Sequence, residues 1–402
     1  MPTAIEIPYG CYWSTPFARW QGAFAGLHAV QFAAHVTRLE LARRGIDPRV
    51  FDYGVLGLSV PQKHAFYGLP WLTGLLGAEA VTGPTIAQAC ATGVRTVLAA
   101  AQEIASGMAE VALVVTADRT SNGPHLYYPD PQGPGGTGAH ENWVFDNFGF
   151  DPFTTKSMLV TAENVAAKFG LDTARQHDLV LTRQEQYAKA TADGAAFLKR
   201  FMTLPFEVPA ANFKKTVKVL DGDEGITIST AEGLARLKPV LPGGTVTYGC
   251  QTHPADANAG IVVASAERAR DLSRAPHLAV RLLGFGQARV EPAHMPEAPA
   301  PAAKAALAQA GLSIADIDVI KLHDPFTAND FAFAEAMGIP VESFNDYGSS
   351  LIWGHPQSPM ATRGIIEVIE QLAIRGGGRG LFSGCAAGDS AMAVVLEVVD
   401  RA

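Results

Sequence analysis

The stretch GIDPRVFD, residues 45–52, recurs 266 residues later as GLSIADID, residues 311–318. Both stretches begin with a glycine that ends an expected helix, and both finish with an apolar residue and an aspartate near an expected strand. Cys90 and His355 are offset by 265 residues, so they take nearly equivalent places in the two copies. We therefore predict two duplicated halves. Chance similarity of two βα units is the alternative.

Apolar periodicity predicts an alternating α/β order in both halves. The elements expected in the first half are a helix at 20–44, a strand at 51–60, a helix at 91–108 and a strand at 111–116. Those expected in the second half are helices at 302–310 and 362–374, and strands at 317–322, 380–383 and 392–398. The 111–116 strand is apolar without interruption, which is typical of a buried strand. We also expect it near a dimer edge.

The middle of the chain, residues 121–240, departs from this pattern. It opens with the glycine-rich run PQGPGGTG at 131–138 and continues with helical periodicity at 157–169 and 173–194. The run lacks the GK[ST] ending of a phosphate-binding loop, so a flexible loop is the better interpretation. A long inserted segment of this kind usually covers an active site or makes an oligomer contact.

Composition indicates a globular protein with reduced thiols. Apolar residues make up 48% of the 402 residues and charged residues 17%, and the net charge of −8 argues against a nucleic-acid binder. The four cysteines show no CxxC spacing, so neither a metal site nor a disulfide framework is predicted. With no secretory signal and no membrane-spanning apolar run in the sequence, we expect a cytoplasmic protein without membrane partners.

Cys90 is the first candidate catalytic residue. It lies at the start of the 91–108 helix between small residues, Ala89 and Ala91, which would let a substrate approach the sulfur. The amides and dipole of a helix N-terminus favour a thiolate, so we expect a lowered thiol pKa. A buried structural cysteine is the alternative.

Three further residues suggest acyl chemistry. His355, between a glycine and a proline, could take a thiol proton and then stabilise the thiolate. Cys385, in the small-residue loop GCAAG at 384–388, could move a proton next to a thioester carbonyl. His323 ends the 317–322 strand and could donate to an enolate oxygen, directly or through a water. Taken singly, each could instead be a structural residue.

In their order, Cys90, His323, His355 and Cys385 resemble the thiolase family, and the likeness covers nearly the whole chain. Three more motifs carry it: SMLVTAENVA at 157–166, EGLARLKP at 232–239, and VTYG at 246–249 followed by Asp256 and Ala257. The resemblance implies that Cys90 carries the acyl group, that His355 activates it, and that Cys385 shuttles the Cα proton. It also implies an oxyanion hole made by the backbone amides of Cys90 and Ala387.

The resemblance further implies a thiolase-like five-layer αβαβα fold built from two βαβαβαββ halves. The expected division is 1–120 plus 241–270 for the N-terminal half, 121–240 for an inserted loop domain over the site, and 271–402 for the C-terminal half. HDPF at 323–326 is similar to the sterol-carrier-protein-type branch, since most thiolases have Asn-Glu-Ala-Phe there. A homodimer or homotetramer is implied.

The resemblance implies coenzyme A as substrate or product, with no tightly bound cofactor, and an acyl-CoA that is cleaved by thiolysis or formed by condensation. Thr227 stands where many relatives have an arginine that helps to hold coenzyme A. Trp353 and the aromatic residues of the insertion suggest a bulky or aromatic acyl group, and His64 and His140 are further candidate binding residues.

Two alternatives stay open at this point. One is a coenzyme A-independent C-acyltransferase similar to the phloroglucinol type, in which His64 and His140 would be extra acid–base groups. The other is a thiolase-fold subunit that needs a small zinc-ribbon/OB-fold protein as partner. A ketosynthase is less favoured, because such enzymes have a histidine or asparagine where Cys385 stands.

Overall fold

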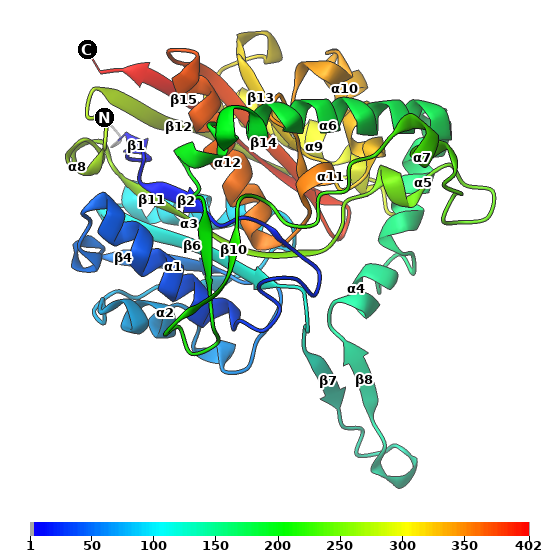
Figure 1. Ribbon diagram of the computed structural model, residues 1–402, viewed down its shortest axis with the longest axis horizontal. Helices are drawn as coiled ribbons and strands as arrows, with labels where there is room; N and C mark the ends of the chain where they lie inside the picture. The colour runs from blue at the N-terminus through cyan, green and yellow to red at the C-terminus, as the bar shows by residue number, and fades with distance from the viewer. Residues whose placement is uncertain (1–3, 402) are drawn as a thin grey trace.

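The computed structural model of the chain describes residues 4–401, and its centre is a mixed sheet. The strand order is β13–β14–β15–β12–β1–β11–β6–β4–β5 (Figure 1). The short strand β1 (Ile5–Glu6) pairs with β11 on one side and β12 on the other, so it joins two half-sheets. Each half-sheet belongs to one of the two sequence repeats.

The two half-sheets repeat one strand order and one set of directions. In the first, β4 (Tyr53–Gly57) runs parallel to β6 (Val111–Arg119), which is antiparallel to β11 (Ala255–Ser265). In the second, β13 (Val319–His323) runs parallel to β14 (Gly378–Ala386), which is antiparallel to β15 (Ser390–Asp400). The next neighbours are antiparallel in both halves: β2 (Tyr12–Ser14) and β3 (Ala18–Arg19) beside β11, and β12 (Leu278–Arg289) beside β15. The predicted duplication is confirmed.

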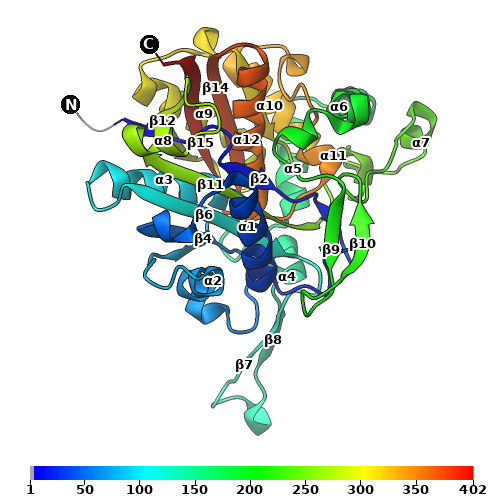
Figure 2. The ribbon, with the colours of Figure 1, turned by 60° about the vertical axis from the view of Figure 1, so that its left-hand side comes forward.

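Helices complete five layers, which Figures 1 and 2 show from two sides. Helices α3 (Thr92–Ala105) and α12 (Ser358–Ile374) pack on each other between the half-sheets. The outer layers are α1 (Ala29–Arg44) with α2 (Gly68–Leu76) on the first half-sheet, and α9 (Pro299–Ala310) with α10 (Thr327–Met337) on the second. The short α8 (Ala266–Leu272) packs against β11. The predicted αβαβα order is confirmed.

The segment 121–240 lies outside these layers. Its β7–β8 hairpin projects from the body of the molecule in both views (Figures 1 and 2). Its helix α6 packs on α10 and on the short α11 (Ser350–Trp353). Its elements are β7 (His125–Tyr128), β8 (Ala139–Asn142), α4 (Phe145–Gly149), α5 (Met158–Lys168), α6 (Thr173–Ala195), β9 (Phe206–Pro209), β10 (Thr216–Leu220) and α7 (Ala231–Ala235). The predicted domain boundaries stay predictions.

Three local expectations are wrong. The helix expected from residue 20 begins only at Ala29, because Gln21 has a φ of 56° and the chain turns there. Strand β6 cannot be a dimer edge, since β4 and β11 occupy both of its sides; β5 (Thr85–Ile86) is the edge strand of the first half-sheet. Cys385 lies within β14 opposite Ala391 and not in a loop.

No helix within residues 4–401 combines the length and the hydropathy that a membrane span requires.

The contact between α3 and α12 generates a stability prediction. A Cβ atom at Gly93 would lie 2.5 Å from the backbone nitrogen of Thr362 and 2.9 Å from the Cβ of Ala361. We expect Gly93→Ala to lower the free energy of unfolding by about 1–3 kcal/mol, because overpacking forces the two helices apart. Urea denaturation followed by circular dichroism measures the change.

Gly74→Ala in α2 is the matched control, because a Cβ there has no neighbour within 4 Å. It should leave the free energy of unfolding unchanged or raise it by roughly 0.5–1 kcal/mol, as expected for alanine over glycine in a helix. Equal effects of the two substitutions would show that the helix contact is not close.

Candidate active site

A strained turn before α3 presents the thiol of Cys90. Ala89 has a φ of 44°, which is uncommon for a residue other than glycine. The hydroxyl of Thr92 fixes this turn: it donates to the carbonyl of Ala89 at 2.6 Å and accepts from the amide of Gln88 at 2.8 Å. Such strain persists only where neighbouring contacts hold it, and it is common at functional sites.

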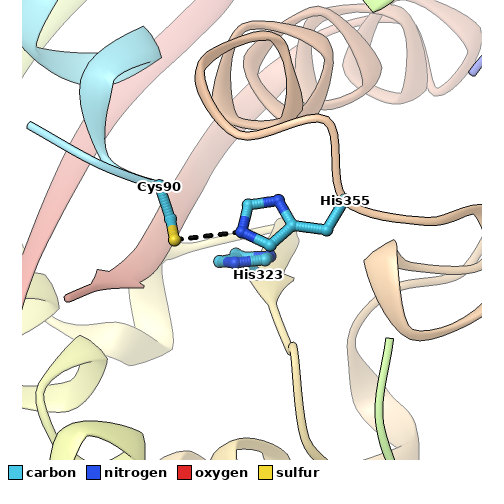
Figure 3. Close-up of side chains that lie close together, drawn as sticks. All are labelled: Cys90, His323 and His355. Carbon is cyan, nitrogen blue, oxygen red and sulfur yellow. Dashed lines mark hydrogen bonds between the residues drawn. The ribbon is translucent and has the colours of Figure 1, made fainter. Parts of the chain in front are cut away.

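His355 reaches Cys90 from the corresponding turn before α12. Its Nε2 lies 2.9 Å from the sulfur of Cys90 (Figure 3). The ring of His323, at the end of β13, lies beside that of His355 with the centroids 4.5 Å apart. The structure therefore brings together three of the four predicted catalytic side chains, and all three are buried.

Hydrogen bonds indicate which nitrogen of each ring carries the proton. The backbone N–H of Gln357 donates to Nδ1 of His355 at 3.3 Å, so in the neutral ring the proton lies on Nε2 and faces Cys90. His355 is neutral at ordinary pH, because burial lowers its pKa to about 3. In this tautomer the ring donates a hydrogen bond to a sulfur or an oxyanion.

His323 has the opposite tautomer. Its Nδ1 lies 2.7 Å from the hydroxyl of Ser350, which itself donates to Asp324 at 2.8 Å. A hydroxyl has one proton to give, so Nδ1 of His323 must be the donor and Nε2 the acceptor. This Nε2 is buried and has no partner among residues 4–401. It can therefore act on an oxygen of the substrate through a water.

Cys385 lies close enough to Cys90 for a charge there to affect its pKa, and it is a protonated thiol. Burial raises its pKa well above the ordinary value, and a negative charge on Cys90 would raise it further. The side-chain amide of Asn329 on α10 donates to the sulfur at 3.4 Å and works in the opposite direction. A thiol that keeps its proton at neutral pH suits a general acid.

Burial, not the helix dipole, sets the acidity of Cys90. It raises the pKa of the thiol to about 12, although hydrogen bonds from the backbone of Ala387 and of Cys90 itself lower it. The expected lowered pKa is therefore wrong for the resting protein. The two backbone groups that contact the sulfur are those predicted to form an oxyanion hole.

Three contributing residues were missed by the sequence analysis. Asp118 is a buried carboxylate that accepts from the amides of Ser59 and Val60 at 2.9 and 2.8 Å and from Ser358 at 2.5 Å, with a pKa raised to about 6 by burial. Gln357 places its Oε1 3.7 Å from the sulfur of Cys90, and Asn329 contacts Cys385. The only available sequence signal was position: Gln357 lies two residues after His355, and Asn329 lies six residues after His323.

The other predicted binding residues lie elsewhere. Trp353 is fully buried against Phe17 and beneath the guanidinium of Arg363. His64 lies beside Trp71 in a shallow surface pocket. His140 lies on the projecting hairpin with its Nε2 3.0 Å from Nδ1 of His125. The structure does not bring these three to Cys90.

The ligand atoms of Cys90, His323 and His355 lie within 4.8 Å of one another, a spacing that a zinc ion could bridge. Coordination would require Nε2 of His355 to lose its proton, which the hydrogen bond at Nδ1 opposes. The group therefore suits proton and oxyanion chemistry better than metal binding.

Three hollows surround this group. A cavity of about 230 Å³ has Cys90 and His355 in its wall, and a second of about 250 Å³ is lined by Ala89, Gln357 and Ala387. Phe148 and Met158 line both cavities, so they adjoin. A surface groove of about 880 Å³ shares Gln251, Thr252 and Pro254 with the first cavity. A long substrate could therefore reach the sulfur from the surface.

The family models, the similar sequences and the similar structures are all thiolases or acetyl-CoA acetyltransferases. Family models for the thiolase N-terminal and C-terminal domains match residues 13–267 and 276–398. An acetyl-CoA acetyltransferase of Allochromatium vinosum is 29% identical over 94% of this chain and 95% of its own length. The Bacillus anthracis acetyl-CoA acetyltransferase structure matches with a TM-score of 0.90 at 26% identity, covering 99% of each chain.

The human mitochondrial 3-ketoacyl-CoA thiolase in complex with CoA matches with a TM-score of 0.87, covering 98% of each chain. At 24% identity it bears on the fold alone. The predicted thiolase-like fold is confirmed.

The pKa of Cys90 generates a test of its resting state. Alkylation by iodoacetamide follows the thiolate fraction, so with a pKa of about 12 the rate should rise tenfold per pH unit between pH 7 and 10 without a plateau. Peptide mass mapping measures the rate at Cys90, and Cys90→Ser supplies the background from other cysteines. A plateau reached below pH 8 would instead indicate a preformed thiolate–imidazolium pair.

Proposed function

Because this chain belongs to the thiolase family and is an acyltransferase of the thiolase type, we propose that it cleaves a 3-oxoacyl-CoA with coenzyme A, or runs the reverse condensation, through an acyl group on Cys90. The observation that carries the proposal is the 2.9 Å contact between the sulfur of Cys90 and Nε2 of His355, together with a second thiol, that of Cys385, which keeps its proton. Two cysteines and a donating histidine supply the nucleophile, the acid and the charge stabilisation that carbon–carbon cleavage needs.

In the cleavage direction, the sulfur of Cys90 attacks the C3 carbonyl of the substrate, and the Nε2–H of His355 donates to the developing thiolate. The bond between C2 and C3 breaks. Cys385 delivers a proton to C2, and the Cys385 thiolate then takes up the proton that Cys90 released, so the thiol of Cys385 is restored. The leaving product is acetyl-CoA, and the acyl group remains on Cys90.

The negative charge on the oxyanion of the acyl-Cys90 intermediate and the charge on the enolate oxygen are stabilised by different groups of the protein. The backbone groups of Cys90 and Ala387, which now contact the sulfur, are suited to the oxyanion of the acyl-Cys90 intermediate. The Nε2–H of His355 and a water held by Nε2 of His323 are suited to the enolate oxygen. The HDPF motif, which supplies His323, supports placing the chain near the sterol-carrier-protein-type branch.

The 880 Å³ groove supports coenzyme A as the acyl carrier. It leads from the surface to the Cys90 cavity, and Arg19 supplies a positive charge in its wall. Thr227, which replaces the arginine of many relatives, lines the same groove. We propose that the groove holds the pantetheine arm and that Arg19 partly replaces the missing arginine.

The 250 Å³ cavity supports an acyl group larger than acetyl. Trp143, Val144 and Phe148 form its apolar side, and the indole N–H of Trp143 donates to the carbonyl of Ser59 at 3.0 Å. A fixed aromatic wall suits a bulky or aromatic acyl group. No contact within residues 4–401 favours the coenzyme A-independent alternative or a zinc-ribbon/OB-fold partner.

We further propose a cytoplasmic homodimer or homotetramer. The exposed side chains of Phe66 and Tyr67 near the edge strand β5, and of Tyr127 and Tyr128 on the projecting hairpin, support self-association.

Substitution of the cysteines tests the proposal. Cys90→Ala should abolish thiolysis of 3-oxoacyl-CoAs, followed as loss of the Mg²⁺-enolate absorbance. Cys385→Ala should lower it at least about 10²-fold, the usual contribution of a general acid, while an acyl adduct on Cys90 still forms from acyl-CoA. Wild-type protein inactive on short, long and aromatic 3-oxoacyl-CoAs would disprove the proposal.

His323 should act on the enolate alone. His323→Leu is expected to lower kcat for thiolysis about 10²-fold, as for a lost oxyanion-hole group, but to change acyl exchange between an acyl-CoA and labelled coenzyme A only a few-fold. His323→Asn, the residue type of most thiolases, should restore part of kcat. An equal loss in both assays would show that His323 only supports the fold.

A further inference from the structure

Gln357, two residues after His355, has a backbone conformation that glycine would adopt more easily. Its φ and ψ are 63° and −115°, and such a conformation costs a residue with a Cβ about 1–3 kcal/mol. Contacts on the following residue hold it: the amide and hydroxyl of Ser358 both donate to Asp118, at 2.9 and 2.5 Å. A side chain is therefore present at a position where glycine would be less strained.

The backbone of Gln357 does not need the side chain. Its N–H fixes the tautomer of His355, and glycine would donate this hydrogen bond equally well. The side chain is buried, and its Oε1 lies 3.7 Å from the sulfur of Cys90. The carboxamide therefore lies beside the sulfur that would carry the acyl group.

The two N–H donors of this carboxamide are unused. Nε2 has no hydrogen-bond acceptor within residues 4–401. Gln357 lines the 250 Å³ cavity, whose other side-chain amide, that of Asn147, donates to Glu141 and to the carbonyl of Trp143. Nε2 of Gln357 is not among the fully enclosed polar atoms without a partner, so a ligand that supplies an acceptor can take the place of water at this donor.

The charge of the surroundings limits that acceptor to a neutral group. No arginine or lysine lines the cavity. Asp118 lies directly behind it, where it accepts from Ser59 and Val60, two residues of the cavity wall. A carboxylate would meet this negative charge without a cation to compensate it, whereas a hydroxyl, ether or carbonyl oxygen would not.

We propose that Gln357 makes this cavity a binding site for acyl groups that carry a neutral oxygen within a few bonds of the thioester carbon, held by the Nε2–H of the carboxamide. This inference rests on the proposed function, because it concerns the acyl group that Cys90 carries. It assigns specificity, not catalysis, to Gln357.

Two acyl donors of equal length test the proposal. Butyryl-CoA and methoxyacetyl-CoA differ by one methylene replaced with an ether oxygen, which can only accept a hydrogen bond. The kcat/KM of each is measured by exchange with labelled coenzyme A. Gln357→Met keeps the length of the side chain but removes the donor, so the ratio of methoxyacetyl to butyryl should fall about threefold to tenfold, as expected for one lost hydrogen bond.

Comparing ratios separates specificity from general damage. A substitution that merely disturbs Cys90 or His355 lowers both kcat/KM values and leaves their ratio unchanged. Gln357→Gly, which fits the backbone conformation, should lose the preference to the same extent. Gln371→Met, the same change at a buried position on α12 remote from the cavities, should leave the ratio at the wild-type value.

A structure of the wild-type protein acylated with methoxyacetyl-CoA gives a readout that needs no variant. The ether oxygen should lie within hydrogen-bond distance of Nε2 of Gln357, and a carboxamide turned away from it would overturn the inference. An unchanged ratio in Gln357→Met and Gln357→Gly would do the same while leaving the proposed function intact. Failure of wild-type Cys90 to form an adduct with any acyl-CoA would overturn the proposed function itself.

Discussion

The close packing of α3 on α12 is the constraint on which the site depends. Gly93, in the first turn of α3, lets the backbone of α12 approach at Thr362. Cys90 and His355 stand just before these two helices, so the distance between their side chains follows from the distance between the helix starts. Gene duplication supplies two equivalent helix starts, and the missing side chain at Gly93 brings them into contact. The contact between Cys90 and His355 is therefore a product of packing between two repeats.

Burial then determines what the paired groups can do. In water, a thiol and an imidazole would exchange a proton readily near neutral pH. Here desolvation raises the pKa of Cys90 and lowers that of His355, so both rest uncharged. Hydrogen bonds from Gln357 and to Ser350 meanwhile hold the two imidazoles in opposite tautomers, one a donor and the other an acceptor.

The sequence predicted those features that follow from spacing. The offset between Cys90 and His355 predicted equivalent helix starts, and apolar periodicity predicted most strands and helices. The sequence analysis was wrong where a property depended on opposing energetic effects, as for the pKa of Cys90, or on contacts with residues far away in the chain. The helix dipole at Cys90 was visible in the sequence, but the opposing burial was not. Strand β6 was recognised as buried, yet its neighbours come from residues 53–57 and 255–265. Asn329 and Asp118 reach the site through tertiary contacts that no local pattern encodes.

The strand β1 has a consequence for how the chain is made. Glu6 pairs with Ala264 on one side and with Arg281 on the other. Strand β1 therefore stays unpaired until residues more than 250 positions later have been synthesised. Pairings this distant in sequence slow folding, and a chain emerging from the ribosome exposes its unpaired strand edges in the meantime. Because His355 and α12 follow even these partners in the chain, the contact between Cys90 and His355 cannot form before them. A chain that stops before His355 would therefore carry Cys90 without this partner.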